Sequence, residues 1–278
     1  MGNQMSLWDI ELPPQNEKKG AEKQENKISF ARVQEKQNKP LFNRRVKVED
    51  ILKLVDKCAY RVSKHELLSD IFQCGAIAIS NQFDKVQAAE REKVYLQIIK
   101  KYDKETQQLI SKIFAEIYIL LTQQIEYGFY DYLGEIYMRS ETQSKGAGQF
   151  FTPYSVSLMC AEVAINETTV NEYIEQDKIL TLHEPTCGAG GMIIAAVDIL
   201  YNKYSFNYSR NLLVECGDID ARCVHMTYLQ LACAGVPAVI YHRDGLTLQT
   251  WQRWETPAYI MQWLRFRDTE KIFYREGK

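Results

Sequence analysis

The sequence predicts an α/β protein in which a helical amino-terminal domain, residues 46–143, precedes a domain of alternating strands and helices, residues 144–278. Three observations predict this fold class. Apolar residues recur three and four positions apart between about residues 48 and 138, as in amphipathic helices. After residue 144, short apolar runs alternate with helical stretches and end in glycines or acids, which is typical of parallel strands. Residues 1–45 are rich in Lys, Glu, Gln and Asn without a sustained apolar period, so we expect a flexible tail there.

Composition excludes some classes of protein. The 278 residues are 46% apolar, which is ordinary for a globular chain of one large or two small domains. The net charge of -2 gives no general attraction to a polyanion, so a DNA partner would require local basic patches or another subunit. No apolar run is long enough to span a membrane. Seven cysteines without paired spacing predict reduced thiols and a cytoplasmic protein.

Two apolar stripes carry the prediction of the helical domain. Few glycines or prolines interrupt them, and we expect helix breaks at residues 81–84 and 127–128. The stripes consist of Ile51, Leu54, Val55 and Cys58, and of Leu109, Ile113, Ile117 and Leu120.

Three units of strand and turn make up the α/β pattern. The strands are expected at residues 179–183, 212–216 and 238–241, and helices at 191–202 and 221–234 separate them. Strands joined by helices in this way predict a parallel sheet with right-handed crossovers.

In an open parallel sheet a ligand binds beyond the carboxyl ends of the strands, so the turn after the first strand is the first place to examine. That turn, residues 184–191, is rich in glycine. Glycines allow positive φ and close approach of a ligand to the backbone, and the following helix presents unpaired N–H groups. Glycines also serve packing in such turns, so the turn alone is weak evidence for a ligand.

Acids follow the next two strands. Asp218 and Asp220 end the second strand, and a carboxylate there can accept the ribose hydroxyls of an adenosine. We favour Asp218, which is nearer the strand tip, and expect Asp220 to cap the helix that begins near Ala221. Asp244 follows the third strand; it either accepts a hydrogen bond from an adenine amino group or is simply a turn residue before Gly245.

A further segment joins the two domains. Thr152 and Pro153 predict the N-cap and first turn of a helix over residues 156–163. The preceding Phe150 and Phe151 either fix the angle between the domains as a hydrophobic staple or form a wall of a ligand pocket.

Taken together, four segments resemble a known family. They are Gly146-x-Gly148-x-Phe150-Phe151-Thr152-Pro153, Glu184-Pro185-x-Cys187-Gly188-x-Gly190-Gly191, Gly217-Asp218-Ile219-Asp220 and Arg243-Asp244-Gly245-Leu246. Their order and spacing resemble the N6-adenine DNA methyltransferases related to the modification subunit of type I restriction-modification systems. The resemblance covers about residues 131–246, and the preceding helical region is similar to the helical domain of that family. It implies a Rossmann-like, S-adenosylmethionine-dependent methyltransferase domain.

The resemblance assigns roles to individual residues, with S-adenosylmethionine as the cofactor. Cys187 is expected to serve packing and not to act as a nucleophile. Asp218 matches the acid that binds ribose, and Asp244 matches the contact with adenine. The segment at the methionine end is matched by Phe150, Phe151, Thr152 and Pro153, and the main cofactor loop by Glu184, Pro185, Cys187, Gly188 and Gly190.

One departure from the family concerns catalysis. The family has an Asn-Pro-Pro-Phe or Asn-Pro-Pro-Tyr motif after the fourth strand, which binds and stacks on the flipped adenine, and this sequence contains no such motif. Residues 255–259 contain Pro257 and Tyr259 and are the nearest substitute, but they follow Asp244 closely and leave little room for a fourth strand. The sequence ends at Lys278, so we expect an incomplete sheet.

Two functional hypotheses follow. The first is a DNA methyltransferase that methylates adenine N6 while a separate specificity subunit selects the DNA sequence. The second is a non-catalytic, shortened homologue that binds the cofactor and acts as a regulatory partner of another methyltransferase subunit or of DNA. A fragment of a longer gene product is a third possibility.

Overall fold

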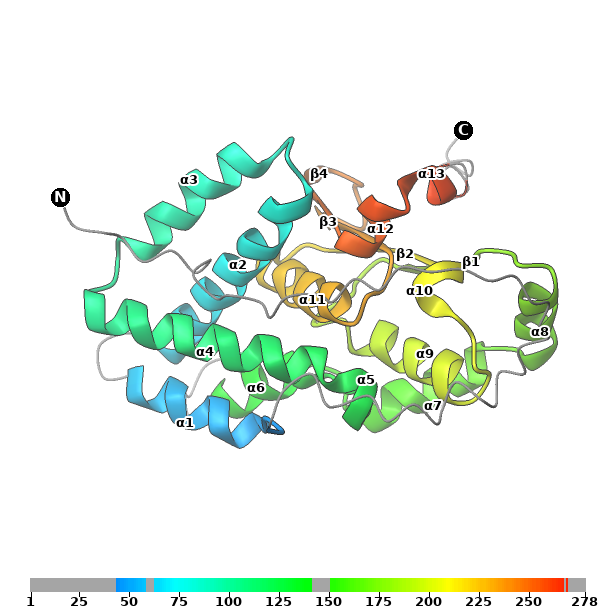
Figure 1. The fold of residues 1–278 in the computed structure, drawn as a ribbon, viewed down its shortest axis with the longest axis horizontal. Coiled ribbons are helices and arrows are strands. Elements are labelled where there is room, and N and C mark those ends of the chain that lie inside the picture. The colour runs from blue at the N-terminus through cyan, green and yellow to red at the C-terminus, as the bar shows by residue number, and fades with distance from the viewer. Residues whose placement is uncertain (1–43, 59–62, 142–150, 268, 270–278) are drawn as a thin grey trace, which may run out of the picture. The chain divides into compact units, whose positions relative to one another are not determined.

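The computed structural model describes residues 44–58, 63–141, 151–267 and 269 (Figure 1). The expected tail therefore lies outside the described residues, apart from Arg44 and Arg45. The described residues belong to one unit, Arg44–Lys278. No helix within them is long and apolar enough to cross a membrane.

The amino-terminal part is helical, as predicted. Ser63 caps α2 by accepting the N–H of Glu66, and Asp103 caps α4 by accepting the N–H of Thr106. The two predicted breaks are confirmed, because α2 ends before Asp84 and α5 ends before Gly128. The helices of this part are α1 (Val48–Cys58), α2 (Lys64–Phe83), α3 (Ala88–Ile99), α4 (Lys104–Thr122), α5 (Gln124–Tyr127) and α6 (Tyr132–Glu141).

Strands and helices alternate in the rest of the chain. Its helices are α7 (Tyr154–Ala164), α8 (Glu167–Glu175), α9 (Gly191–Asn202), α10 (Tyr208–Asn211), α11 (Ala221–Cys233), α12 (Pro257–Met261) and α13 (Trp263–Phe266). Its strands are β1 (Leu180–Glu184), β2 (Leu212–Asp218), β3 (Ala238–Arg243) and β4 (Thr250–Glu255).

The sheet has the order β1-β2-β3-β4. The first three strands are parallel, with Leu182 beside Val214 and Val214 beside Ala238, so the predicted Rossmann-like α/β arrangement is confirmed. The expectation that little room remained for a fourth strand was wrong. β4 pairs antiparallel with β3, and an antiparallel hairpin requires only a short turn where a parallel strand requires a long crossover.

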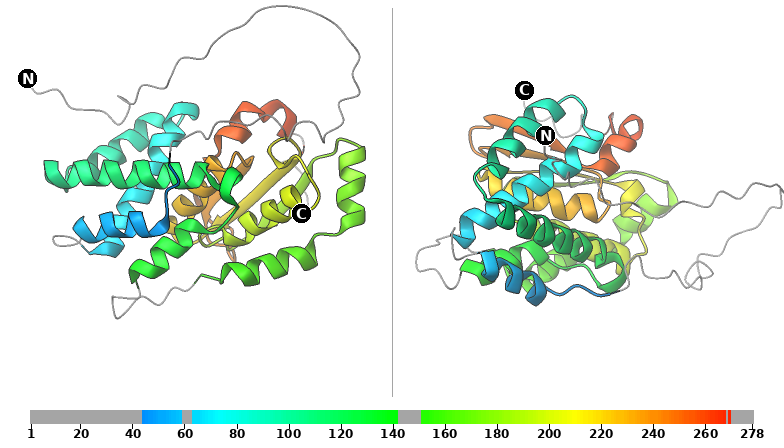
Figure 2. Two further views of the ribbon diagram at one scale, coloured as in Figure 1. Left: turned by 60° about the horizontal axis from the view of Figure 1, so that its bottom comes forward. Right: turned by 60° about the vertical axis from the view of Figure 1, so that its left-hand side comes forward.

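Helices cover both faces of the sheet (Figure 1). On one face, α9 and α11 pack against strands whose central member, β2, is buried at every position. On the other face, Tyr259 and Phe266 from α12 and α13 pack against Leu213, Val239 and Tyr241. α11 also contacts α2, α4 and α6, so the helical part packs directly on the α/β part (Figure 2).

The outer edge of β4 is covered by side chains of the helical part. The carbonyl oxygen of Arg253 accepts hydrogen bonds from Arg91 Nη2 at 2.9 Å and Gln87 Nε2 at 3.4 Å. The guanidinium of Arg91 also lies 3.9 Å from the ring centroid of Trp254. Among the described residues, β1 has no strand on its outer side.

The segment that imitates the adenine-binding motif has a structural role. Thr256 is fully buried; its Oγ1 donates to the carbonyl of Val236 at 2.7 Å and accepts the N–H of Ala238 at 2.9 Å. It also caps α12, which begins at Pro257. Because β4 runs antiparallel, this segment lies at the amino end of β3, opposite the edge where the parallel strands end. It is therefore not a substitute adenine site.

We predict that Thr256→Val destabilises the protein by about 1–3 kcal/mol, because the substitution leaves two buried backbone groups without a partner. Urea denaturation followed by circular dichroism measures the change. Thr250→Val, at an exposed position at the start of β4, is the control and should change stability by less than about 0.5 kcal/mol. Equal effects of the two substitutions would contradict the role of Thr256.

Candidate functional site

The carboxyl edge of the parallel strands gathers most of the residues that the sequence singled out. The turn of residues 184–190 follows β1, Asp218 is the last residue of β2, and Asp244 directly follows β3. The turns after β1 and β3 come close, because a Cβ on Gly245 would lie 3.5 Å from the carbonyl oxygen of Pro185. Three strand tips therefore border one site.

The carboxylate of Asp218 joins the first two tips. Its Oδ2 accepts the N–H of Gly188 and its Oδ1 accepts the N–H of Asp220, each at 2.9 Å. The residue is 9% exposed. Each carboxylate oxygen has two lone pairs, so both oxygens keep capacity to accept a further hydrogen bond.

The glycine turn has a backbone conformation that disfavours other residues. Gly188 has φ +54° and Gly190 has φ +96°, both in the left-handed region. A Cβ on Gly188 would lie 3.2 Å from the ring of Phe151, and one on Gly190 would lie 3.1 Å from Thr227 Oγ1. Thr227 also donates to the carbonyl of Gly188 at 2.9 Å. The turn thus passes closely between Phe151 and α11.

Glu184 and Cys187 have structural contacts within this turn. The Glu184 carboxylate accepts the N–H of Thr186 at 3.2 Å and remains half-buried. Cys187 is buried, and its Sγ accepts from Thr227 Oγ1 at 3.5 Å. Burial raises the pKa of the neighbouring Cys216 thiol well above its usual value, and contact with Cys187 raises it further. These contacts indicate packing thiols, in line with the expectation for Cys187.

The segment before α7 differs in part from the prediction. Phe150 lies outside the described residues, whereas the ring of Phe151 lies 5.7 Å from that of Tyr137 on α6. Thr152 is not the N-cap. Pro153 has that position, with an extended ψ of 135° that keeps it out of the helix, and α7 begins at Tyr154.

Asp220 caps α11 as predicted, by accepting the N–H of Arg222 at 2.9 Å. Burial of the Asp220 carboxyl opposes ionisation, but hydrogen bonds from the side chain and backbone of Arg222 outweigh it and lower its pKa. The Arg222 guanidinium also donates to Tyr137 Oη at 2.8 Å and contacts His65 Nε2. Sequence reasoning missed the contacts of Arg222 with His65 and Tyr137, because these residues are distant in the chain from Arg222.

The side chain of Asp244 stabilises the turn after β3, which was one of the two roles predicted for it. Its Oδ1 accepts the N–H groups of Leu246 at 2.8 Å and Thr247 at 3.2 Å. Both hydrogen bonds favour the carboxylate and lower its pKa. The contact with adenine stays a prediction.

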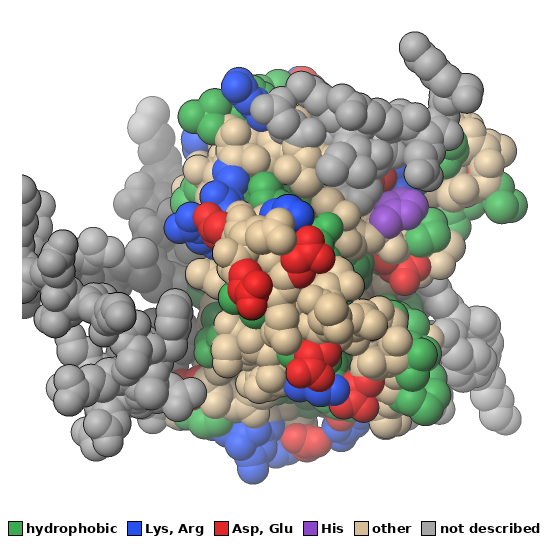
Figure 3. Space-filling model, turned by 90° about the vertical axis from the view of Figure 1, so that its right-hand side faces the viewer, with side chains coloured by type: hydrophobic (Ala, Val, Ile, Leu, Met, Phe, Trp, Pro, Cys, Tyr) green, Lys and Arg blue, Asp and Glu red, His purple; other side chains and the backbone are tan. Residues whose placement is uncertain are grey.

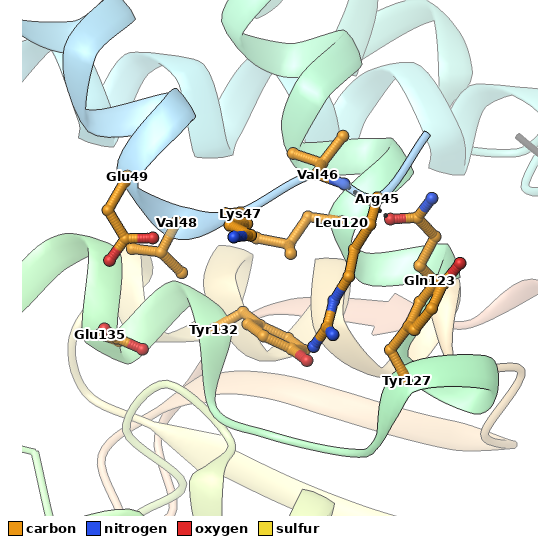
Figure 4. A pocket seen from close by; sticks show the side chains of 10 residues that line it. All are labelled: Arg45, Val46, Lys47, Val48, Glu49, Leu120, Gln123, Tyr127, Tyr132 and Glu135. Carbon is orange, nitrogen blue, oxygen red and sulfur yellow. Dashed lines mark hydrogen bonds between the residues drawn. The ribbon is translucent and has the colours of Figure 1, made fainter. Parts of the chain in front are cut away.

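A groove beside the sheet and a cavity on the helical part lie within the described residues. A groove of about 420 Å³ runs along β1 and reaches Glu184 and Met192, with α7, the start of α8 and α9 as its walls. A cavity of about 390 Å³ lies on the helical part, where Arg45 stacks over Tyr127 (Figure 4). The second cavity contains none of the predicted site residues. On the face that Figure 3 shows, acidic and basic side chains are interspersed without a continuous basic tract among the described residues.

Comparison with protein-family models agrees with the resemblance found in the sequence. The N-6 DNA Methylase family model matches residues 128–271, just over half of the chain. A crystal structure of the type I restriction-modification system methyltransferase subunit from Streptococcus thermophilus is similar at 15% identity with a TM-score of 0.37. That match covers 71% of this chain and 39% of the other, so the matched part spans well under half the length of that subunit. No curated protein matches the chain.

We predict that Asp220→Ala lowers stability at pH 7 by about 1 kcal/mol, because α11 loses its cap. Asp220→Asn keeps a capping oxygen and should lose less. Since the folded-state pKa of Asp220 lies below its usual value of 3.8, its charge stabilises the fold above that pH and ceases to do so as the pH falls through the folded value. The unfolding temperatures of wild type and Asp220→Ala should therefore converge in acid. If the difference between the two unfolding temperatures is the same at pH 7 and at pH 3, the charge-dependent part of the prediction is contradicted.

Proposed function

The chain belongs to the N-6 DNA methylase family, and from this premise we propose that it binds S-adenosylmethionine as a DNA adenine-N6 methyltransferase-like protein. The observation that carries the proposal is the position of Asp218 at the tip of β2, where its carboxylate accepts one N–H from the glycine turn that follows β1 and another from the turn that leads into α11. An adenosine lies across strand tips in this manner in doubly wound α/β folds, with an acid at the second tip accepting its ribose hydroxyls.

The residues at the carboxyl edge fit such a cofactor. The positive φ of Gly188 and Gly190 leaves a turn without side chains at the points where Phe151 and Thr227 approach, so a ligand can reach the backbone. In the proposed complex, Asp218 accepts the ribose hydroxyls and Asp244 accepts from the adenine amino group. Glu184, Pro185, Cys187 and the two glycines form the main cofactor loop. Phe151, Thr152 and Pro153 pack against the methionine end, and Phe150, the fourth residue predicted for that segment, lies outside the described residues. The bound cofactor would supply an electrophilic methyl group on its sulfonium.

A specific observation favours the second candidate, a cofactor-binding partner without its own transferase activity. Methyl transfer to an adenine amino group requires acceptors that orient it toward the sulfonium and a pocket for the extruded base. The nearest sequence substitute, Thr256 to Tyr259, is buried at the opposite edge of the sheet. Catalysis by this chain therefore depends on groups outside that segment.

We also propose a protein partner, either a specificity subunit or another methyltransferase subunit, with DNA as the shared ligand. One face of α7 supports a protein contact, because Val156, Met159 and Val163 are 39%, 60% and 85% exposed at helical spacing. The stripe lies on the helix that forms a wall of the groove beside β1. We further propose a cytoplasmic location, because the seven cysteines lack the paired spacing of a disulfide framework.

Calorimetric titration with S-adenosylmethionine tests cofactor binding. We expect wild type to bind and Asp218→Ala to bind at least about tenfold more weakly, because two hydrogen bonds from ribose to a carboxylate are lost. Asp103→Ala removes the cap of α4 in the helical part and is a matched control that should keep wild-type affinity. Absence of binding by folded wild-type protein would refute the proposal.

Transfer of a radiolabelled methyl group to adenine-rich duplex DNA separates the two candidate functions. Incorporation that disappears in Asp218→Ala supports a transferase. Cofactor binding without incorporation, both by the chain alone and together with co-purifying subunits, supports the non-catalytic partner.

A further inference from the structure

A buried carboxylate from the helical part lies against the first residue of α9. Asp131 directly precedes α6 and is 6% exposed. Its Oδ1 accepts the N–H of Gly134 at 2.9 Å and a hydrogen bond from Gln230 Nε2 at 2.8 Å. α9 is the helix that begins at the end of the glycine turn.

Two glycines make this approach possible. A Cβ on Gly191, the first residue of α9, would lie 2.8 Å from Asp131 Oδ2, and one on Gly134 would lie 2.2 Å from the same atom. Any side chain at either position would displace the carboxylate. The amino end of α9 also favours a nearby negative charge through the helix dipole.

Gln230 connects this carboxylate to the glycine turn. Its side chain is fully buried on α11, and its Nε2 donates both to Asp131 Oδ1 and, at 2.7 Å, to the carbonyl of Ala189. Ala189 lies between the two glycines with positive φ. Gln230 Oε1 accepts the N–H of Leu133 at 3.4 Å, so the side-chain amide of Gln230 contacts both the helical part and the turn.

The stability of the fold alone does not account for this network of buried polar side chains. Burial raises the pKa of Asp131, the hydrogen bonds from Gln230 and Gly134 lower it in part, and the charge of Glu135 raises it further. Buried polar groups of this kind contribute little net stability compared with apolar residues of the same volume, but when fully paired they fix one arrangement of the segments they join. The segments joined are the start of α6, the start of α9 and the glycine turn.

We propose that Asp131 and Gln230 are positioning residues that hold the glycine turn in its cofactor-binding conformation, acting through the Ala189 carbonyl and the first turn of α9. The inference rests on the proposed function, since it concerns the turn that would bind the cofactor. According to this inference, the helical part influences cofactor affinity through Asp131, although Asp131 does not itself contact the cofactor.

The test compares three variants of the network with a matched control. Asp131→Ala and Gln230→Met remove the hydrogen bonds, and Asp131→Asn keeps an acceptor at the same place. Asp70→Ala is the control, because Asp70 is also a buried acid of the helical part, 7% exposed, and bonds to Tyr102 Oη at 2.7 Å, away from the turn. Each variant is assessed by its S-adenosylmethionine affinity, its thermal unfolding and the hydrogen exchange of the amides of residues 187–191.

We expect Asp131→Ala and Gln230→Met to bind S-adenosylmethionine about tenfold or more weakly and to exchange the turn amides faster. Asp131→Asn should bind within about threefold of wild type, and Asp70→Ala should lose thermal stability with unchanged affinity and turn exchange. Wild-type affinity and exchange in Asp131→Ala and Gln230→Met, or equal effects of Asp70→Ala on affinity and exchange, would overturn the inference. If wild type itself binds no cofactor, the proposed function fails, and the exchange measurement alone still decides whether these residues hold the turn.

Discussion

The carboxyl edge of the sheet depends on one acid. Asp218 accepts an N–H from the turn after β1 and another from the turn that leads into α11, so a single carboxylate sets the distance between two strand tips. Asp220 then caps α11, and the capped helix presents Arg222 to His65 and Tyr137. A chain of short polar contacts thus extends from the sheet to the helical part, and its first link is a residue placed at the end of a fully buried strand.

Sequence pattern predicted the elements whose cause is local. The bounds of α9 and the parallel strands followed from apolar runs and glycines, and the cap at Asp220 followed from a short acid before a helix. β4 was missed because a hairpin leaves only a weak turn signal, and Thr152 was misassigned because its neighbour Pro153 is extended. Contacts of Arg222 with His65 and Tyr137 join residues 157 and 85 positions apart, and periodicity carries no information about such pairs. Pro257 and Tyr259 matched a fragment of the motif, but the role of their segment depends on which end of a strand it follows.

α11 explains why helical and sheet parts form one unit. Its side chains are buried on opposite sides, some against β2 and β3 and others against α2, α4 and α6. His225 lies in this layer and is shielded from water, and burial is the main cause that lowers its pKa to about 3. Its ring lies 5.2 Å from the ring of Trp254. A neutral imidazole packs there like an aromatic residue. The helical part consequently packs directly against the segment before α7, where the buried Tyr137 contacts Phe151.

The two flanks of the sheet are protected unequally. Arg91 and Gln87 occupy the outward carbonyl of Arg253 on β4, so that flank offers fewer free backbone groups to another chain. β1 is the other outer strand, and a largely apolar groove runs beside it. Among the described residues, no further strand pairs with its outer side. Exposed strand edges of this kind template pairing between molecules. Pairing with a strand of another molecule is therefore disfavoured at the β4 flank, and within the described part of the chain the β1 flank is the one that could accept it.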